Sequence, residues 1–168
     1  MSEGMGAATR AAATAVAILV GVAAGSLALL VAGMRWELPL VLDAVRRLNR
    51  TTMNPRVMGT AGTAGTRTSI IQHVGRKSGR AYETPVDVIA AKTGFLIALP
   101  YGTRADWVRN VVASGSATVV ANGERIDVDR PTIVATSDVA DLIPRRTLRT
   151  LTLFGVKQCL HLENHESG

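Results

Sequence analysis

Gly75-Arg-Lys-Ser-Gly79 lies between two apolar runs, and the predicted fold is organised around it. The runs at 68–74 and 82–91 have the apolar and β-branched composition typical of strands. Two adjacent cations therefore stand at a turn framed by glycines, where free backbone N–H groups are also available. Such a turn suits a phosphate or a carboxylate. The alternative is a solvated hairpin tip whose charges only keep a sheet edge soluble.

The composition is that of one domain with an appendage. The chain has 168 residues, with 19 Lys and Arg against 13 Asp and Glu, so its net charge is +6. Nine cations lie from Arg35 to Arg80, where the only acidic residues are Glu37 and Asp43. This excess suits a membrane surface, a nucleic acid or a polyanionic cofactor, but the scarcity of aromatic residues disfavours nucleic acid. The single cysteine, Cys159, excludes an internal disulfide, and no Cys/His set indicates a metal site.

The N-terminal segment, residues 1–35, predicts a transmembrane helix. Residues 11–34 contain no charged side chain and are bracketed by Arg10 and Arg35. A helix of this length reaches about 36 Å, enough to cross a hydrocarbon core. A signal peptide is the alternative, but the run is longer than a usual signal core and no clear A-x-A site closes it. More cations follow the run than precede it, which predicts a single-pass anchor with the following domain in the cytoplasm.

Residues 36–66 form a second, basic segment. Trp36 fits a membrane interface. An amphipathic helix is predicted next, from apolar residues at helical spacing with arginines beside them. These residues are Leu38, Leu42, Val45 and Leu48, with Arg46, Arg47 and Arg50. The helix could lie on anionic lipid, or it could pack on the domain with a solvated basic face. Residues 53–67, rich in glycine and threonine, are predicted to be a loop or linker.

Residues 67–162 are predicted to form a β-rich domain, followed by a short tail at 163–168. Further strands are expected at 94–100, 117–121, 125–129 and 131–136. Asn122-Gly123 suits a type I′ turn, because both residues tolerate positive φ. Five or six closely spaced strands with few helices favour a small barrel.

Two helices are expected in this domain. The first runs from Asp106, as its cap, to about Ser114. Its inner face is expected to consist of Trp107, Val108, Val111 and Val112. The second spans 138–153 and is broken near Pro144, with an arginine cluster at 145–149 that faces solvent. His73 is expected in a strand, and His161 and His165 in a tail without a partner carboxylate, so none is expected to be a ligand.

Three stretches carry a resemblance to a known family: Gly75–Gly79 with Thr84-Pro-Val86, then Leu99–Gly115, then Phe154–Leu160. The block Tyr-Gly…Asp-Trp-x-Arg-Asn after a Gly-Arg-Lys-Ser-Gly turn is fairly specific. Together they resemble the deazaflavin-dependent nitroreductase family, split β-barrel proteins of actinobacteria and related organisms that use coenzyme F-420. The likeness spans about residues 55–162. It implies a mainly β fold with helices, a split β-barrel preceded here by the N-terminal transmembrane helix.

The resemblance implies a coenzyme site. The basic turn would hold the phosphate and polyglutamate tail, the strand from Tyr82 to Val86 would run beside the deazaflavin, and residues 101–103 would close over it. The positive end of the helix at Asp106 would face the same anion. The implied cofactor-binding residues are Arg76, Lys77, Ser78, Tyr82, Pro85, Val86, Tyr101, Gly102, Thr103, Asp106, Trp107 and Asn110.

The activity implied is hydride transfer from reduced coenzyme F-420 to a quinone or a nitro compound, with Tyr101 as the candidate catalytic proton donor. The anchor favours a lipid-soluble quinone, and exposed barrel edges favour a homodimer. FMN is the less favoured cofactor. The alternatives are a non-catalytic split-barrel binding protein for a flavin, haem or fatty acid, and a module whose basic segment chiefly binds lipid surfaces.

Overall fold

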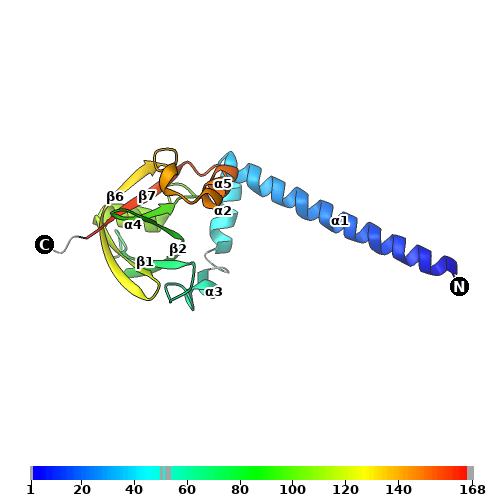
Figure 1. Ribbon diagram of the computed structural model, residues 1–168, viewed down its shortest axis with the longest axis horizontal. Helices are drawn as coiled ribbons and strands as arrows, with labels where there is room; N and C mark the ends of the chain where they lie inside the picture. Colours follow the sequence, from blue (N-terminus) through cyan, green and yellow to red (C-terminus); the bar gives the residue numbers. More distant parts are fainter. Residues whose placement is uncertain (1, 50, 52–53, 166–168) are drawn as a thin grey trace.

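The computed structural model describes residues 2–49, 51 and 54–165. Helix α1 (Ser2–Arg35) projects from a domain built on one seven-stranded sheet (Figure 1). The remaining helices are α2 (Pro39–Leu48), α3 (Asn54–Met58), the short 3-10 helix η2 (Ala140–Leu142), α4 (Asp106–Ser114) and α5 (Arg145–Leu153). The strands are β1 (Ser69–Val74), β2 (Ala81–Val86), β3 (Val88–Ala91), β4 (Gly94–Ala98), β5 (Ser116–Ala121), β6 (Glu124–Ala135) and β7 (Gln158–Asn164).

The sheet has the strand order β2-β1-β5-β6-β7-β4-β3, and every pairing is antiparallel. Its two edge strands, β2 and β3, are consecutive in the chain and are separated only by Asp87. The sheet must therefore curl until its edges approach each other, as a split barrel does. The predicted fold class, mainly β with helices and an apolar N-terminal helix, is confirmed. Pro85 lies on edge strand β2, a position that tolerates proline because an edge strand has a neighbour on one side only.

The strand predicted over 82–91 is in fact two strands. Residues up to Val86 pair with β1, whereas residues from Val88 pair with β4 at the other edge. The continuous apolar pattern hides this change of partner at Asp87. Conversely, the strands predicted at 125–129 and 131–136 are one strand, β6, with a bulge between Asp129 and Thr132. Strand β7 was not predicted, and it contains His161, which therefore lies in the sheet.

The Asn122-Gly123 turn between β5 and β6 is confirmed, with φ angles of 52° and 84°. Helix α4 also lies where it is predicted, but two details of the prediction are wrong. Ala105, whose side chain makes no capping hydrogen bond, occupies the N-cap, and Asp106 is the first helical residue. Val112, expected on the inner face, is 46% exposed, whereas Val108 and Val111 are buried.

Two apolar clusters form the core. The larger one joins α4 to the sheet, and its members are Ile71, Val86, Ile97, Leu99, Val108, Val111, Val119, Val128, Leu160 and Leu162. The smaller one lies under α5 and contains Leu96, Ile143, Leu151, Val156 and Cys159. Cys159 is fully buried, and burial raises the pKa of its thiol. The break predicted near Pro144 is also present, since η2 ends before it and α5 begins after it.

The N-terminal segments attach to this domain in different ways. The stretch Thr14–Arg35 of α1 is 22 residues long and is apolar and long enough to cross a membrane. Most of it is exposed, although Met34 near its end is buried. The predicted linker at 53–67 contains α3 and a series of turns, although Met53 itself is outside the described residues. It is tied to the β5–β6 hairpin, because the Gly123 N–H donates to the Gly62 carbonyl at 2.6 Å.

Candidate functional site

Two cavities open side by side on the domain. The first, here called the basic cavity, has a volume of about 770 Å³ and is lined by Arg46, Asn49, His73, Gly75, Arg76, Lys77, Ser78, Tyr82, Glu83, Thr84, Pro85, Tyr101, Ala105, Asp106, Trp107 and Asn110. The second, the apolar cavity, has a volume of about 860 Å³ and is bounded by β3, β4, the β2–β3 junction, η2 and α5. They share a wall made of Pro85, Tyr101, Ala105 and Trp107.

The structure brings most of the predicted cofactor residues together. Nine line the basic cavity: Arg76, Lys77, Ser78, Tyr82, Pro85, Tyr101, Asp106, Trp107 and Asn110. Val86 and Gly102 line only the apolar cavity, and Thr103 lines neither of the two. Trp107, expected in the core, is half-buried: it packs against the larger cluster and also forms part of the shared wall.

The turn at 75–79 is closed by its own backbone. The Gly75 N–H donates to the Arg80 carbonyl, and the Gly79 N–H to the Gly75 carbonyl, both at 2.8 Å. Gly79 has a φ of 66°, in the region that favours glycine. The Ser78 hydroxyl lies 3.1 Å from the Tyr82 hydroxyl, so Ser78 fixes the turn to β2. Lys77 is exposed and makes no polar contact with the described residues, so its ammonium is available to a ligand.

Arg76, in contrast, is held in place by α4. Its Nη1 donates to Asn110 Oδ1 at 2.8 Å, and its Nη2 pairs with Asp106 Oδ1 at 3.0 Å. The Arg76 backbone N–H also donates to Asn110 Oδ1, at 3.2 Å. Asp106 thus places a negative charge against Arg76. An anion at the start of α4, as predicted, would therefore have to bind to Arg76 next to the negatively charged Asp106.

His73 belongs to the same network, although its sequence position predicted only a strand residue. It is 6% exposed, stacks on Tyr82 with ring centroids 5.9 Å apart, and lines the basic cavity. Its Nδ1 lies 3.3 Å from Asn110 Nδ2 and its Nε2 lies 3.2 Å from Thr84 Oγ1. Because Asn110 Oδ1 accepts from Arg76, the amide must donate to His73 Nδ1. His73 is therefore neutral, with its proton on Nε2.

The free energy of unfolding is expected to fall as the pH drops below about 6.5, the ordinary pKa of histidine. Burial lowers the pKa of His73 in the folded state, so the unfolded chain binds more protons between the two pKa values. The contribution of neutral His73 to the free energy of unfolding is thus fully present above about pH 6.5. It is lost as the pH falls toward and through the folded-state pKa. Urea unfolding at a series of pH values measures the slope.

The matched variants for this measurement are His73→Gln and His161→Gln. The first should abolish the slope just below about pH 6.5, while the second should retain it. Carboxylates contribute at lower pH: the hydrogen bond from His165 and that from Arg130 lower the pKa of Asp129. An unchanged slope in His73→Gln would contradict the assignment of a buried neutral His73.

Helix α2 completes the basic cavity. Arg46 Nη2 donates to the Tyr101 backbone carbonyl at 2.7 Å, and Asn49 Nδ2 donates to the Tyr101 hydroxyl. Arg46 Nε is buried and has no hydrogen-bond partner among the described residues. The prediction left open whether this helix lies on lipid or packs on the domain, and its inner face packs on the domain. The helical spacing indicated two faces, but it gave no sign that Arg46 lies on the inner one.

Tyr101 lies where the two cavities meet. Burial raises the pKa of its phenol, so the hydroxyl is protonated at neutral pH. On the apolar side, the cavity wall combines aliphatic residues of β3 and β4 with Leu142, Pro144 and Leu151 and with the cations Arg67 and Arg146. A flat apolar molecule could lie in this cavity while an anionic extension reaches the basic cavity.

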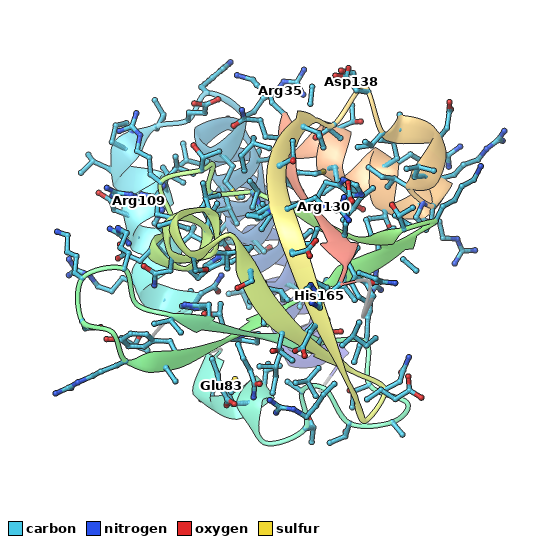
Figure 2. All side chains as sticks on the ribbon, turned by 90° about the vertical axis from the view of Figure 1, so that its left-hand side faces the viewer. Arg35, Glu83, Arg109, Arg130, Asp138 and His165 are labelled. Atoms are coloured by element: carbon cyan, nitrogen blue, oxygen red, sulfur yellow. The ribbon has the colours of Figure 1, made fainter. Side chains whose placement is uncertain are left out.

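A separate charged cluster lies on the face opposite α1. Figure 2 shows Arg130 and His165 at the front of this face. His165 Nδ1 lies 2.7 Å from Asp129 Oδ2, and Arg130 Nη2 pairs with Glu163 Oε2 at 2.9 Å. The expectation that His165 has no partner carboxylate is therefore wrong, because β6 brings Asp129 beside it. These pairs join β6 to the end of β7 and its next residue, and none of the four residues lines either cavity.

No protein-family model matches the chain, and no curated protein matches it significantly. Among solved structures it is similar to HutZ, the heme storage protein from Vibrio cholerae, at 11% identity and a TM-score of 0.47, covering 67% of this chain and 90% of HutZ. A second structure, described as a domain-swapped dimer, has 13% identity and a TM-score of 0.48 over 72% of this chain and 98% of that one. The protein Atu2129 from Agrobacterium tumefaciens, of unknown function, has 15% identity and a TM-score of 0.41 over 69% and 55%. Likenesses of this strength point to no ligand and no activity.

Proposed function

We propose that this chain is a membrane-associated oxidoreductase that uses reduced coenzyme F-420 to reduce a quinone or a nitro compound. The observation that supports this best is the meeting of a basic cavity and an apolar cavity at Tyr101. A coenzyme with a flat ring and a polyanionic tail needs both environments next to each other. The resemblance of the Gly75–Gly79 turn and the 99–115 stretch to deazaflavin-dependent nitroreductases agrees with this.

The donor set of the basic cavity suits an anionic tail. Lys77 supplies an exposed ammonium that has no polar partner among the described residues, and Arg46 is a second cation in the lining. Arg76 adds a third cation whose orientation is fixed by Asn110. Arg and Lys are the side chains that bind phosphate and carboxylate best.

The shared wall would orient the reacting groups. Coenzyme F-420, when bound in its reduced form, supplies the hydride. A quinone that accepts one hydride and one proton becomes a quinol, and the coenzyme leaves oxidised. Tyr101 carries a proton at Oη, lines both cavities, and is held by Asn49, so it is the proposed proton donor or substrate contact. Trp107 and Pro85 would restrict water at the same wall.

The proposal is tested with the full chain in detergent. Uptake of coenzyme F-420 is followed by its fluorescence, with FMN titrated in parallel. Oxidation of the reduced coenzyme is followed by absorbance after addition of menadione or a nitroaromatic. An enzyme should oxidise it in proportion to the protein added. Uptake without oxidation would instead indicate a binding protein, and no uptake of F-420 would refute the proposal.

The Lys77→Ala variant is expected to bind coenzyme F-420 at least about tenfold more weakly, since a hydrogen bond to a charged group contributes about 1.5–3 kcal/mol. The loss should shrink as salt is added, because the contact is solvent-exposed. Lys92→Ala is the matched control, since Lys92 is exposed but lines neither cavity. Equal affinity of Lys77→Ala and Lys92→Ala would remove Lys77 from the tail site.

A further inference from the structure

The end of α1 is fastened to the domain beside α5. Arg35 Nη1 donates to the Thr152 carbonyl of α5 at 3.0 Å. Glu37 lies just beyond α1, and Lys157 lies in the segment between α5 and β7. Glu37 Oε1 pairs with Lys157 Nζ at 2.8 Å. Figure 1 shows α5 and α2 at the side of the domain from which α1 departs, with the C-terminus at the opposite side. A bilayer that holds α1 would thus lie next to α5 and α2.

The exposed surface of α5 is cationic, with one exposed leucine at its C-terminal end. Arg145, Arg146 and Arg149 are exposed, and none has a polar side-chain partner among the described residues. Helix α5 contains no acidic residue, and the acidic residue nearest to it in the sequence is Asp141. Leu153, at its last turn, is 56% exposed. No side-chain interaction with the part of the chain that the structure describes accounts for these arginines.

The outer face of α2 has the same character. Leu40, Ala44, Arg47 and Leu48 recur at helical spacing and are exposed, with Leu40 at 87% and Leu48 at 55%. Trp36, between α1 and α2, is 72% exposed. Tryptophan at the end of an apolar helix, followed by leucines and arginines, is the pattern of a segment at the headgroup level of a bilayer.

We propose that α5 and the outer face of α2, together the docking face, bind the anionic phospholipid surface around α1. The arginines complement lipid phosphates and carboxylates, and the exposed leucines and Trp36 enter the boundary between headgroups and acyl chains. A bilayer is the occupant because the docking face continues directly from α1. This inference does not depend on the proposed redox function.

Docking would also set the position of the apolar cavity relative to the bilayer surface. Leu142, Arg146, Thr147 and Thr150 line that cavity from the η2–α5 side. The wall of the cavity that carries Arg146 would therefore lie at the lipid headgroups. An apolar molecule dissolved in the bilayer would reach this wall without crossing bulk water.

The test uses the full chain, one copy per nanodisc, with a nitroxide at Leu153→Cys. A label at Glu124→Cys, on the β5–β6 hairpin, is the reference, and the chain without an added cysteine controls for Cys159, which is buried. Collision of the label with a water-soluble nickel chelate reports its exposure. In phosphatidylserine-containing discs the Leu153 label should be protected, and in phosphatidylcholine discs it should be exposed. The Glu124 label should be exposed in both.

The charge variants decide the origin of the protection. Each arginine near an anionic surface is expected to raise the ratio of docked to undocked domain about fivefold. R145Q/R146Q/R149Q should therefore lower this ratio by roughly a hundredfold. K92Q/R109Q/R125Q removes the same charge at exposed positions outside the docking face and should leave the protection intact. Equal effects of the two triple variants, or an exposed Leu153 label in anionic discs, would overturn the proposal. Protection that needs two copies per disc, whatever the lipid, would identify a chain–chain contact and overturn it as well.

Discussion

The Asn110→Leu variant is expected to be about 3 kcal/mol less stable than the unmodified chain, because it leaves two groups without partners at roughly 1–3 kcal/mol each. Asn110 is 6% exposed and similar in size to leucine, so packing changes little. Its side chain accepts from the Arg76 backbone and guanidinium and donates to His73. Leucine can do neither, so Arg76 would also lose its fixed orientation. Urea unfolding measures the loss of stability, and F-420 titration measures its effect on binding.

Asn110→Asp separates the two halves of this network. A carboxylate still accepts from Arg76, but it also presents an oxygen to His73 Nδ1, which then needs a proton. We expect the pKa of His73 to rise, so that the loss of stability below about pH 6.5 disappears. An Asn110→Leu chain as stable as the unmodified one, or an Asn110→Asp chain with the original pH slope, would show that the amide does not connect Arg76 to His73.

Gly94→Ala is expected to lower the free energy of unfolding by about 3 kcal/mol or more, as overpacking against rigid atoms does. A Cβ at Gly94 would lie 2.0 Å from the Leu162 carbonyl oxygen and 2.8 Å from Glu163 Cα. Both are backbone atoms of β7, which pairs with β4 in the middle of the sheet. The strands would have to separate. Thermal or urea unfolding of the purified variant measures the effect.

Gly59→Ala is the matched control, because a Cβ at Gly59 meets no atom within 4 Å. It should change stability by less than about 1 kcal/mol. If Gly94→Ala were equally harmless, the close approach of β4 and β7 at this point would be wrong.

Local patterns in the sequence were sufficient for much of the fold. The Asn122-Gly123 turn was predicted because the two residues themselves tolerate the φ angles found. Helix α4 and the break at Pro144 were predicted in the same way, from apolar spacing and from the missing N–H of proline. In each case the deciding physics acts within a few residues, so it can be read without tertiary contacts.

The rest depends on partners far apart in the chain. His73 meets Asn110 across 37 residues, and Arg46 meets Tyr101 across 55. No short pattern marks either pair, because histidine is common in strands and arginine on helix surfaces. The change of pairing at Asp87 has the same cause: the sheet closes there, and an apolar run looks alike on both sides of the junction. The resemblance, in contrast, named twelve residues, of which nine line the basic cavity.

Because α2 packs over Tyr101, the residue at which a shortened, detergent-free version of the protein begins decides whether the basic cavity is complete. Starting the chain at Trp36 removes the apolar helix α1 and keeps Arg46 and Asn49 in place. Starting it at Arg67 removes both side chains and leaves the Tyr101 carbonyl and hydroxyl open to water. Failure of the shorter version to bind coenzyme would report a missing side of the cavity, and it would say nothing about a need for lipid.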